Sequence, residues 1–123
     1  SHVNSIGLKN KMDPDKLEKS KNRFLKSPLV LVVISSLKEG KIPESEQILS
    51  AGAVCISILN AALAYGWGAN WLTGWTAHDE EFKKTALNLS ENETIAGYVH
   101  IGTNTKILED RDRPNLSKVV EWR

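Results

Sequence analysis

No lysine, arginine, aspartate or glutamate occurs between Glu46 and Asp79. The first half of this stretch is apolar and rich in alanine, and Pro43 with acidic residues in the next turn is typical of a helix start. We therefore predict a long helix that begins at Pro43 and ends at Gly66, a residue suited to a left-handed C-terminal cap. Apolar residues around the helix predict that protein surrounds it on all sides. In so short a chain, part of that protein would be a partner subunit.

The same helix is long enough to cross a membrane, since about 20 apolar residues span a bilayer. Gln47, Ser50, Ser57 and Asn60 interrupt the apolar run and raise the free energy of insertion. We therefore favour a helix that is buried on most sides in a soluble protein over a membrane-associated helix, and expect no membrane partner.

Length and composition indicate a single domain, residues 1–123, of ordinary globular character. The net charge of +1 argues against a protein that follows nucleic-acid phosphates. Cys55 is the single cysteine, so an internal disulfide is excluded and a structural zinc site is disfavoured. The lone thiol and the absence of an apolar leader favour a cytoplasmic location.

The N-terminal half predicts two further elements. Residues 1–12 are polar, and we expect them to be irregular. Asp13 and Pro14 predict a helix start, and a charged, solvated helix should run to about Phe24. The β-branched run Leu29–Ile34 predicts a strand that is buried on both faces, inside a sheet with helices on either side.

Beyond the long helix we expect a glycine- and tryptophan-rich loop over residues 67–75. Thr76 and Asp79 resemble a capping box, which predicts a short helix through about Leu87. Residues 95–102 predict a second strand. The apolar residues of the C-terminal tail predict that it wraps over a surface; these are Leu116, Val119, Val120 and Trp122.

Common catalytic and metal-binding motifs are absent, and His78 and His100 are interpreted as hydrogen-bonded structural residues. A cofactor would therefore bring any chemistry. Residues 67–75 could seat a planar ring, because tryptophans offer flat surfaces and glycines allow close backbone approach. The alternative is a turn anchored by tryptophans in a small core. Arg111 and Arg113 suit a phosphate, with a solvated charge run as the alternative.

The order of these segments resembles the nitroreductase family, of the compact bacterial type. The segments are the P-L-V-L-V-V strand, the helix ending A-A-L-A-Y-G, W-G-A-N-W-L-T-G, a helix, E-T-I-A-G-Y-V-H-I-G and R-x-R-P. The likeness covers the C-terminal two-thirds of the family and lacks its N-terminal segment that holds the FMN phosphate. It implies an α+β fold with a mixed, mostly antiparallel sheet flanked by helices, in a homodimer with FMN at the interface.

The resemblance also implies cofactor contacts, and no catalytic side chain is required. The residues implied to contact FMN are Trp71, Leu72, Thr73, Gly74, Arg111 and Arg113. The residues implied to border NAD(P)H are Ala61, Ala62, Leu63, Ala64, Tyr65 and Gly66. The implied reaction reduces a small-molecule acceptor, such as a nitroaromatic or a quinone, with NAD(P)H through the flavin. The alternative is a non-enzymatic dimerisation module that keeps the fold without flavin.

Overall fold

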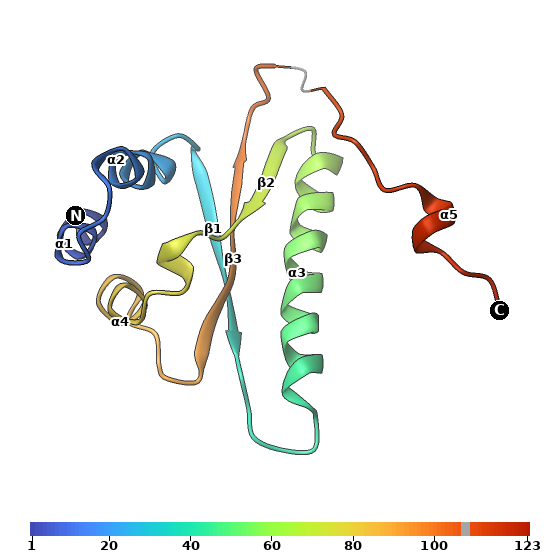
Figure 1. Ribbon diagram of the computed structural model, residues 1–123, viewed down its shortest axis with the longest axis horizontal. Coiled ribbons are helices and arrows are strands. Elements are labelled where there is room, and N and C mark those ends of the chain that lie inside the picture. The colour runs from blue at the N-terminus through green and yellow to red at the C-terminus, as the bar shows by residue number, and fades with distance from the viewer. Residues whose placement is uncertain (107–108) are drawn as a thin grey trace.

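The chain is built on a three-stranded antiparallel sheet in the order β1–β3–β2 (Figure 1). The computed structural model describes residues 1–106 and 109–123. The strands are β1 (Leu29–Ser36), β2 (Gly68–Leu72) and β3 (Glu93–Gly102). β3 is central, because it pairs with β1 along one edge and with β2 along the other. The α+β class is confirmed, and each strand pairing among the described residues is antiparallel.

Helices cover both faces of the sheet. The long helix α3 (Glu44–Ala64) lies against one face, while α1 (His2–Lys9), α2 (Pro14–Arg23) and α4 (Glu80–Leu87) lie on the other (Figure 1). This arrangement places two layers of apolar side chains around β3, which is the most buried strand.

Each face of the sheet has its own core. Between α3 and the sheet, Cys55 of α3 packs with Val33 of β1 and Val99 of β3. On the opposite face, Ile95 and Tyr98 are buried in a second cluster. The sheet therefore holds its helices by apolar burial on both sides, which is the main favourable term in folding.

Three predicted helix ends are confirmed. The Asp13 carboxylate accepts a hydrogen bond of 3.1 Å from the Lys16 backbone N–H at the start of α2. α3 begins directly after Pro43. Gly66 follows the last turn of α3 with a φ of +80°, which is the left-handed conformation that favours glycine.

The N-terminal helix α1 corrects the expectation that residues 1–12 are irregular. Val3 and Ile6 lie three positions apart on one side of this helix and are buried with Leu17 and Phe82. Two buried apolar side chains in a short polar segment are a weak periodic signal, so the helix depends on packing against its neighbours more than on propensity.

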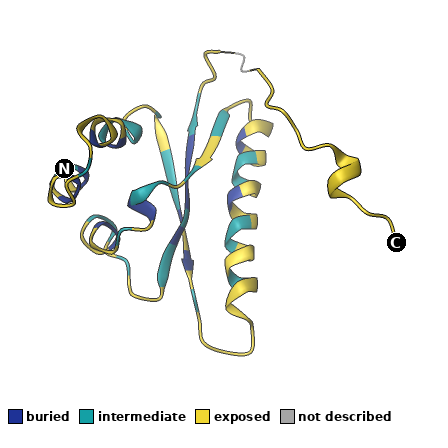
Figure 2. Ribbon diagram, in the orientation of Figure 1, coloured by how far each residue is buried: buried dark blue, intermediate teal, exposed yellow. Residues whose placement is uncertain are grey.

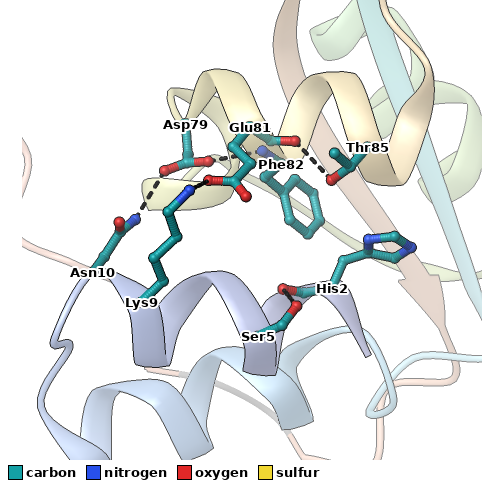
Figure 3. Close-up of polar contacts among 8 residues, drawn as sticks. All are labelled: His2, Ser5, Lys9, Asn10, Asp79, Glu81, Phe82 and Thr85. Carbon is teal, nitrogen blue, oxygen red and sulfur yellow. Dashed lines mark hydrogen bonds and ion pairs between the residues drawn. The ribbon is translucent and has the colours of Figure 1, made fainter.

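Polar contacts also attach α1 to α4 (Figure 3). The Lys9 ammonium forms an ion pair with Glu81, and the Asn10 amide donates a 3.1 Å hydrogen bond to the Asp79 carboxylate. Asp79 uses its other oxygen to accept a 2.7 Å hydrogen bond from the Phe82 backbone N–H. One carboxylate therefore caps α4 and holds α1.

Strand β1 is confirmed, with helices on both faces, but its expected central place is wrong. Among the described residues β1 pairs with β3 alone and forms an edge of the sheet. Leu29 and Ile34 are also exposed, so the expected burial of the whole run is wrong. A continuous apolar run predicts burial on both faces but gives no information on which strand edges are paired.

The glycine- and tryptophan-rich segment is a strand over most of its length, so the expected loop is wrong. Residues 68–72 form β2, and a 3₁₀ turn, η1 (Trp75–Ala77), follows. Pairing with β3 imposes the extended backbone on glycine and asparagine, which are uncommon in strands. The capping box is also corrected: the cap of α4 is Asp79, while Thr76 is buried in η1.

α3 is covered by this chain on one side only, which corrects the expectation of protein on all sides. Cys55 and Ala62 are buried, whereas Leu49, Ile56 and Leu63 are exposed. Figure 2 shows exposed residues along much of α3. Leu49 is 73% exposed. The helix is long and apolar enough to cross a membrane, and only 17% of its most apolar window is buried.

The C-terminal tail, which contains α5 (Leu116–Val119), extends away from the sheet (Figure 1). Its apolar side chains, expected to lie on a surface, are exposed in this chain, and Trp122 is 92% exposed.

Candidate functional site

A positively charged groove of about 740 Å³ lies beside the C-terminal end of α2. It reaches across the start of β2 and the end of β3 to the segment that follows β3. We call it the cationic groove, and its lining includes Lys19, Arg23, Lys26, Leu72, His100 and Arg111. No aspartate or glutamate lines it among the residues that the structure describes.

A second groove, of about 550 Å³, lies on the α3 side of the sheet. We call it the apolar groove. Side chains from the last turns of α3 and from β1 form its walls, including Leu31, Ile58, Ala61 and Tyr65. The two grooves share Pro28, Ile101 and Gly102. An apolar surface therefore adjoins a cationic one at the end of β3.

The structure separates the residues predicted for FMN. Leu72 and Arg111 line the cationic groove together, although they lie far apart in the sequence. Trp71 is outside that lining: its indole Nε1 donates a 3.1 Å hydrogen bond to the Ala96 carbonyl. A Cβ on Gly52 of α3 would lie 3.8 Å from the same indole. The ring of Trp71 thus packs between β3 and α3, as an anchoring tryptophan does.

Arg23 connects Thr73 and Gly74 to the cationic groove. Its guanidinium donates a 2.8 Å hydrogen bond to the Thr73 carbonyl. Gly74 has a φ of +98°, and the same guanidinium occupies the place where a side chain at this position would lie. Arg113, in contrast, is outside the groove and forms an ion pair of 2.6 Å with Asp110.

The residues predicted for NAD(P)H lie at the end of α3. Ala61, Ala62 and Tyr65 line the apolar groove. Leu63, Ala64 and Gly66 belong to the same turns but are outside its lining. The small side chains of the alanines leave room beside β1, while the Tyr65 ring is largely exposed.

His100 is a groove residue that was interpreted from the sequence as structural. Its side chain is 7% exposed, and its Nδ1 lies 3.1 Å from the Ser27 hydroxyl, in agreement with that interpretation. Its Nε2, however, is buried without a hydrogen-bond partner among the described residues. Burial, and secondarily the Arg23 charge, lower the pKa of His100 below its ordinary value of 6.5.

This lowered pKa predicts a loss of stability in mild acid. The unfolded chain takes up a proton on His100 at a higher pH than the folded chain does. The contribution of the neutral ring is therefore complete above about pH 6.5 and is lost as the pH falls below it. Urea denaturation at about pH 7.5 and about pH 5.5 should show a smaller pH difference in His100→Gln than in the natural chain. Equal differences would contradict the prediction.

Lys19, Arg23 and Lys26 were missed because they look like a solvated helix face. Lys19 and Arg23 are one turn apart on α2, and Lys26 follows the helix. Lys19 and Arg23, at i and i+4, share one face of α2, but solvated charges on a helix have the same spacing. That this face meets Arg111 depends on the fold and is not visible in the sequence.

These features suit a ligand with a flat, apolar ring and an anionic group. The apolar groove offers surface for a ring, and the cationic groove offers guanidinium and ammonium groups for a phosphate. β2 is an edge strand of the described sheet, so one side of its backbone is available to hydrogen-bond a ring heteroatom. The chain's residues therefore fit a nucleotide cofactor such as FMN.

Comparisons with known proteins agree with this fold. The model of the nitroreductase family matches residues 3–103. The chain belongs to the nitroreductase family, and the match includes residues before the P-L-V-L-V-V strand but ends before R-x-R-P.

Two relatives of this chain carry nitroreductase names. "Putative NAD(P)H nitroreductase YdjA" of Escherichia coli is 29% identical over 92 residues, which cover 74% of this chain and 50% of that protein. A "Putative NAD(P)H nitroreductase" of Haemophilus influenzae is 29% identical over 97 residues, which cover 77% of this chain and 52% of that protein. The chain spans about half the length of these relatives.

Two solved structures share the fold. A nitroreductase-like family protein from Bacillus cereus superposes with a TM-score of 0.76 at 23% identity, over 98% of this chain and 63% of that protein. A "putative nitroreductase in complex with FMN" from Exiguobacterium sibiricum superposes with a TM-score of 0.55 at 11% identity. That alignment covers 98% of this chain and 54% of the other.

Proposed function

We propose that this chain is part of an FMN-dependent oxidoreductase that uses NAD(P)H to reduce nitroaromatics, quinones or related acceptors. The observation that carries the proposal is the meeting of the apolar and cationic grooves at Gly102, in a chain of the nitroreductase family. When bound, FMN supplies the two-electron redox chemistry, so the protein contributes positioning and electrostatics.

The chain's own residues would divide these tasks. Leu72 and the backbone of Thr73 and Gly74 would lie beside the flavin, with Trp71 holding β2 against the sheet. Arg111 would hold the phosphate, and Arg113 would reach it on leaving Asp110. The last turns of α3, residues 61–66, would border the nicotinamide. Apolar walls exclude water and strengthen polar interactions at the ring.

We further propose a homodimer, because the outer side of α3 carries the exposed apolar residues Leu49, Ile56 and Leu63. A second copy would cover them and close the flavin site. The buried, unpaired thiol of Cys55 supports a reducing, cytoplasmic location.

A flavin titration tests the proposal. The purified chain and its full-length gene product should bind FMN, with a yellow spectrum, and oxidise NAD(P)H when a nitro compound or quinone is added. Arg111→Gln should weaken FMN binding about tenfold, since it removes a charged phosphate contact. Arg123→Gln is the matched control, because Arg123 is exposed and pairs only with Glu121 among the described residues.

The alternative is a dimerisation module without flavin, which the exposed side of α3 also supports. Both functions predict a dimer, but only the oxidoreductase predicts stoichiometric FMN. A colourless full-length dimer that takes up no added FMN would reject the oxidoreductase and leave the module.

A further inference from the structure

The junction between β2 and η1, residues 73–75, is tied to α2 at two points. The Arg23 guanidinium donates a 2.8 Å hydrogen bond to the Thr73 carbonyl. One turn earlier on α2, the Ser20 hydroxyl accepts a 2.9 Å hydrogen bond from the Trp75 indole. Both contacts join segments that lie far apart in the sequence. The backbone of this junction is therefore held by α2 as well as by the strand that precedes it.

The C-terminal end of α2 is itself fixed on the central strand. Phe24, the neighbour of Arg23, packs edge-on against the ring of Tyr98, with the ring centroids 5.0 Å apart. Phe24 also stacks on His100, with the centroids 6.1 Å apart. Both partners are buried residues of β3. Such aromatic contacts add to the free energy of apolar burial. The backbone of Arg23 thus has a fixed position relative to β3.

Gly74 gives the junction a backbone conformation that is essentially limited to glycine. Its φ is +98° and its ψ is 178°. Conformations of this kind cluster at active sites and ligand clamps. The Gly74 N–H donates no hydrogen bond to another described residue, and the residue is only half-buried. A rigidly held N–H that the fold leaves without a partner is available to a ligand.

Arg23 acts on the same peptide unit that carries this N–H. The carbonyl of Thr73 and the N–H of Gly74 belong to one peptide group, and hydrogen bonds in a chain polarise one another. A cation that donates to the carbonyl therefore makes the N–H a stronger donor. Arg23 forms no ion pair among the described residues, so no carboxylate offsets its charge at the carbonyl.

We propose that Arg23 is a positioning residue for the flavin ring, because it holds the peptide between Thr73 and Gly74 and strengthens the Gly74 N–H as a donor to a ring atom that gains negative charge on reduction. This inference rests on the proposed function, which places the same backbone beside the flavin. A hydrogen bond to a charged acceptor is stronger than one to a neutral acceptor. The donor would therefore stabilise the reduced ring more than the oxidised ring.

Nuclear magnetic resonance of the flavin-free chain tests the contact itself. Arg23→Met removes the guanidinium and keeps an apolar stem, so the resonances of the Thr73 carbonyl carbon and the Gly74 amide nitrogen should move. They should move less in Arg23→Lys, which keeps a charged donor. Ser20→Ala removes the other tie to α2 and should lower the thermal midpoint while moving these two resonances less. Unmoved resonances in Arg23→Met, or equal movement in Ser20→Ala, would overturn the proposal.

The midpoint potential of FMN bound to the purified chain tests the effect on the ring. Arg23→Met should weaken the binding of reduced FMN about tenfold relative to oxidised FMN, which lowers the two-electron potential by about 30 mV. Arg23→Lys should recover most of this loss. A titration against a redox dye of known potential, followed by absorption, measures the change.

Lys19→Met is the matched control for charge. It removes one positive charge from the same helix, one turn away, and Lys19 has no contact with the Thr73 carbonyl. Lys19 also lines the cationic groove, but a contact with the FMN phosphate would count equally in both redox states. The potential should therefore fall less than half as far as in Arg23→Met. An equal fall would show a general effect of charge and overturn the proposal.

The two measurements separate failure of this inference from failure of the proposed function. If the chain binds FMN and the potential is unchanged in Arg23→Met, the inference fails and the oxidoreductase remains. If the two resonances move as expected but the natural chain takes up no FMN, the proposed function fails. The Arg23 contact is then a structural tie alone, and the inference falls with the function.

Discussion

Gly97→Ala should destabilise the folded chain by about 3 kcal/mol, because it inserts a side chain where the Trp71 indole already lies. Both Nε1 and Cδ1 of Trp71 overlap the position that a Cβ on Gly97 would take. The ring would have to move away and lose its hydrogen bond to the Ala96 carbonyl, which contributes about 1 kcal/mol of this total. Urea denaturation followed by circular dichroism measures the loss.

Gly52→Ala is the matched control for this substitution. A Cβ on Gly52 would meet the same indole at 3.8 Å, an ordinary contact, and alanine favours the α3 helix. This variant should be about 0.5 kcal/mol more stable than the natural chain. In Gly97→Ala/Trp71→Leu the smaller side chain should relieve the overlap, so the double variant should lose less stability than the sum of the two single changes. Additive losses would show that Trp71 and Gly97 do not interact.

The elements marked by local chemistry could be predicted from the sequence. Asp13, Pro43 and Gly66 fix helix ends by backbone hydrogen bonding and φ preference, and these signals act within a few residues. The β-branched strand and the strand over residues 95–102 are similarly local. Their pairing order depends on distant contacts, so the edge position of β1 was missed.

The elements that depend on distant partners could not be predicted. α1 has a buried side of only a few residues and is completed by Leu17 and Phe82. β2 has glycine and asparagine in a strand because β3 pairs with it and Trp71 fills the space over Gly97. Propensity is a weak guide wherever such tertiary contacts decide the backbone.

The candidate site likewise depends on contacts between distant parts of the chain. Leu72 was selected by resemblance and Arg111 also by its phosphate chemistry, and both lie in one groove, while Arg113 lies outside it. Lys19 of α2 and Lys26 after it have no sequence property that distinguishes them from solvated charges. Only the packing of α2 beside the end of β3 gives them a shared ligand surface.

The largest effect on assembly should come from the outer side of α3. Leu49, Ile56 and Leu63 are spaced seven residues apart, so they form a stripe along one side of the helix. Leu49→Glu/Ile56→Glu places two carboxylates in this stripe, and their burial in a dimer would need desolvation without partners. We expect the dimer dissociation constant to rise at least about 100-fold, which corresponds to about 3 kcal/mol.

Size-exclusion chromatography with light scattering measures this change in mass. The natural chain should elute as a dimer, and Leu49→Glu/Ile56→Glu should elute at the monomer mass of 13.7 kDa. Leu8→Glu/Leu25→Glu makes the same chemical change at exposed leucines of α1 and of the turn after α2, so it should remain dimeric. A natural chain that is already monomeric, or a control that also dissociates, would contradict the assignment of this stripe as the subunit interface. If the natural chain instead needs detergent to stay in solution, the exposed side of α3 faces lipid, because the length and composition of the helix allow either partner.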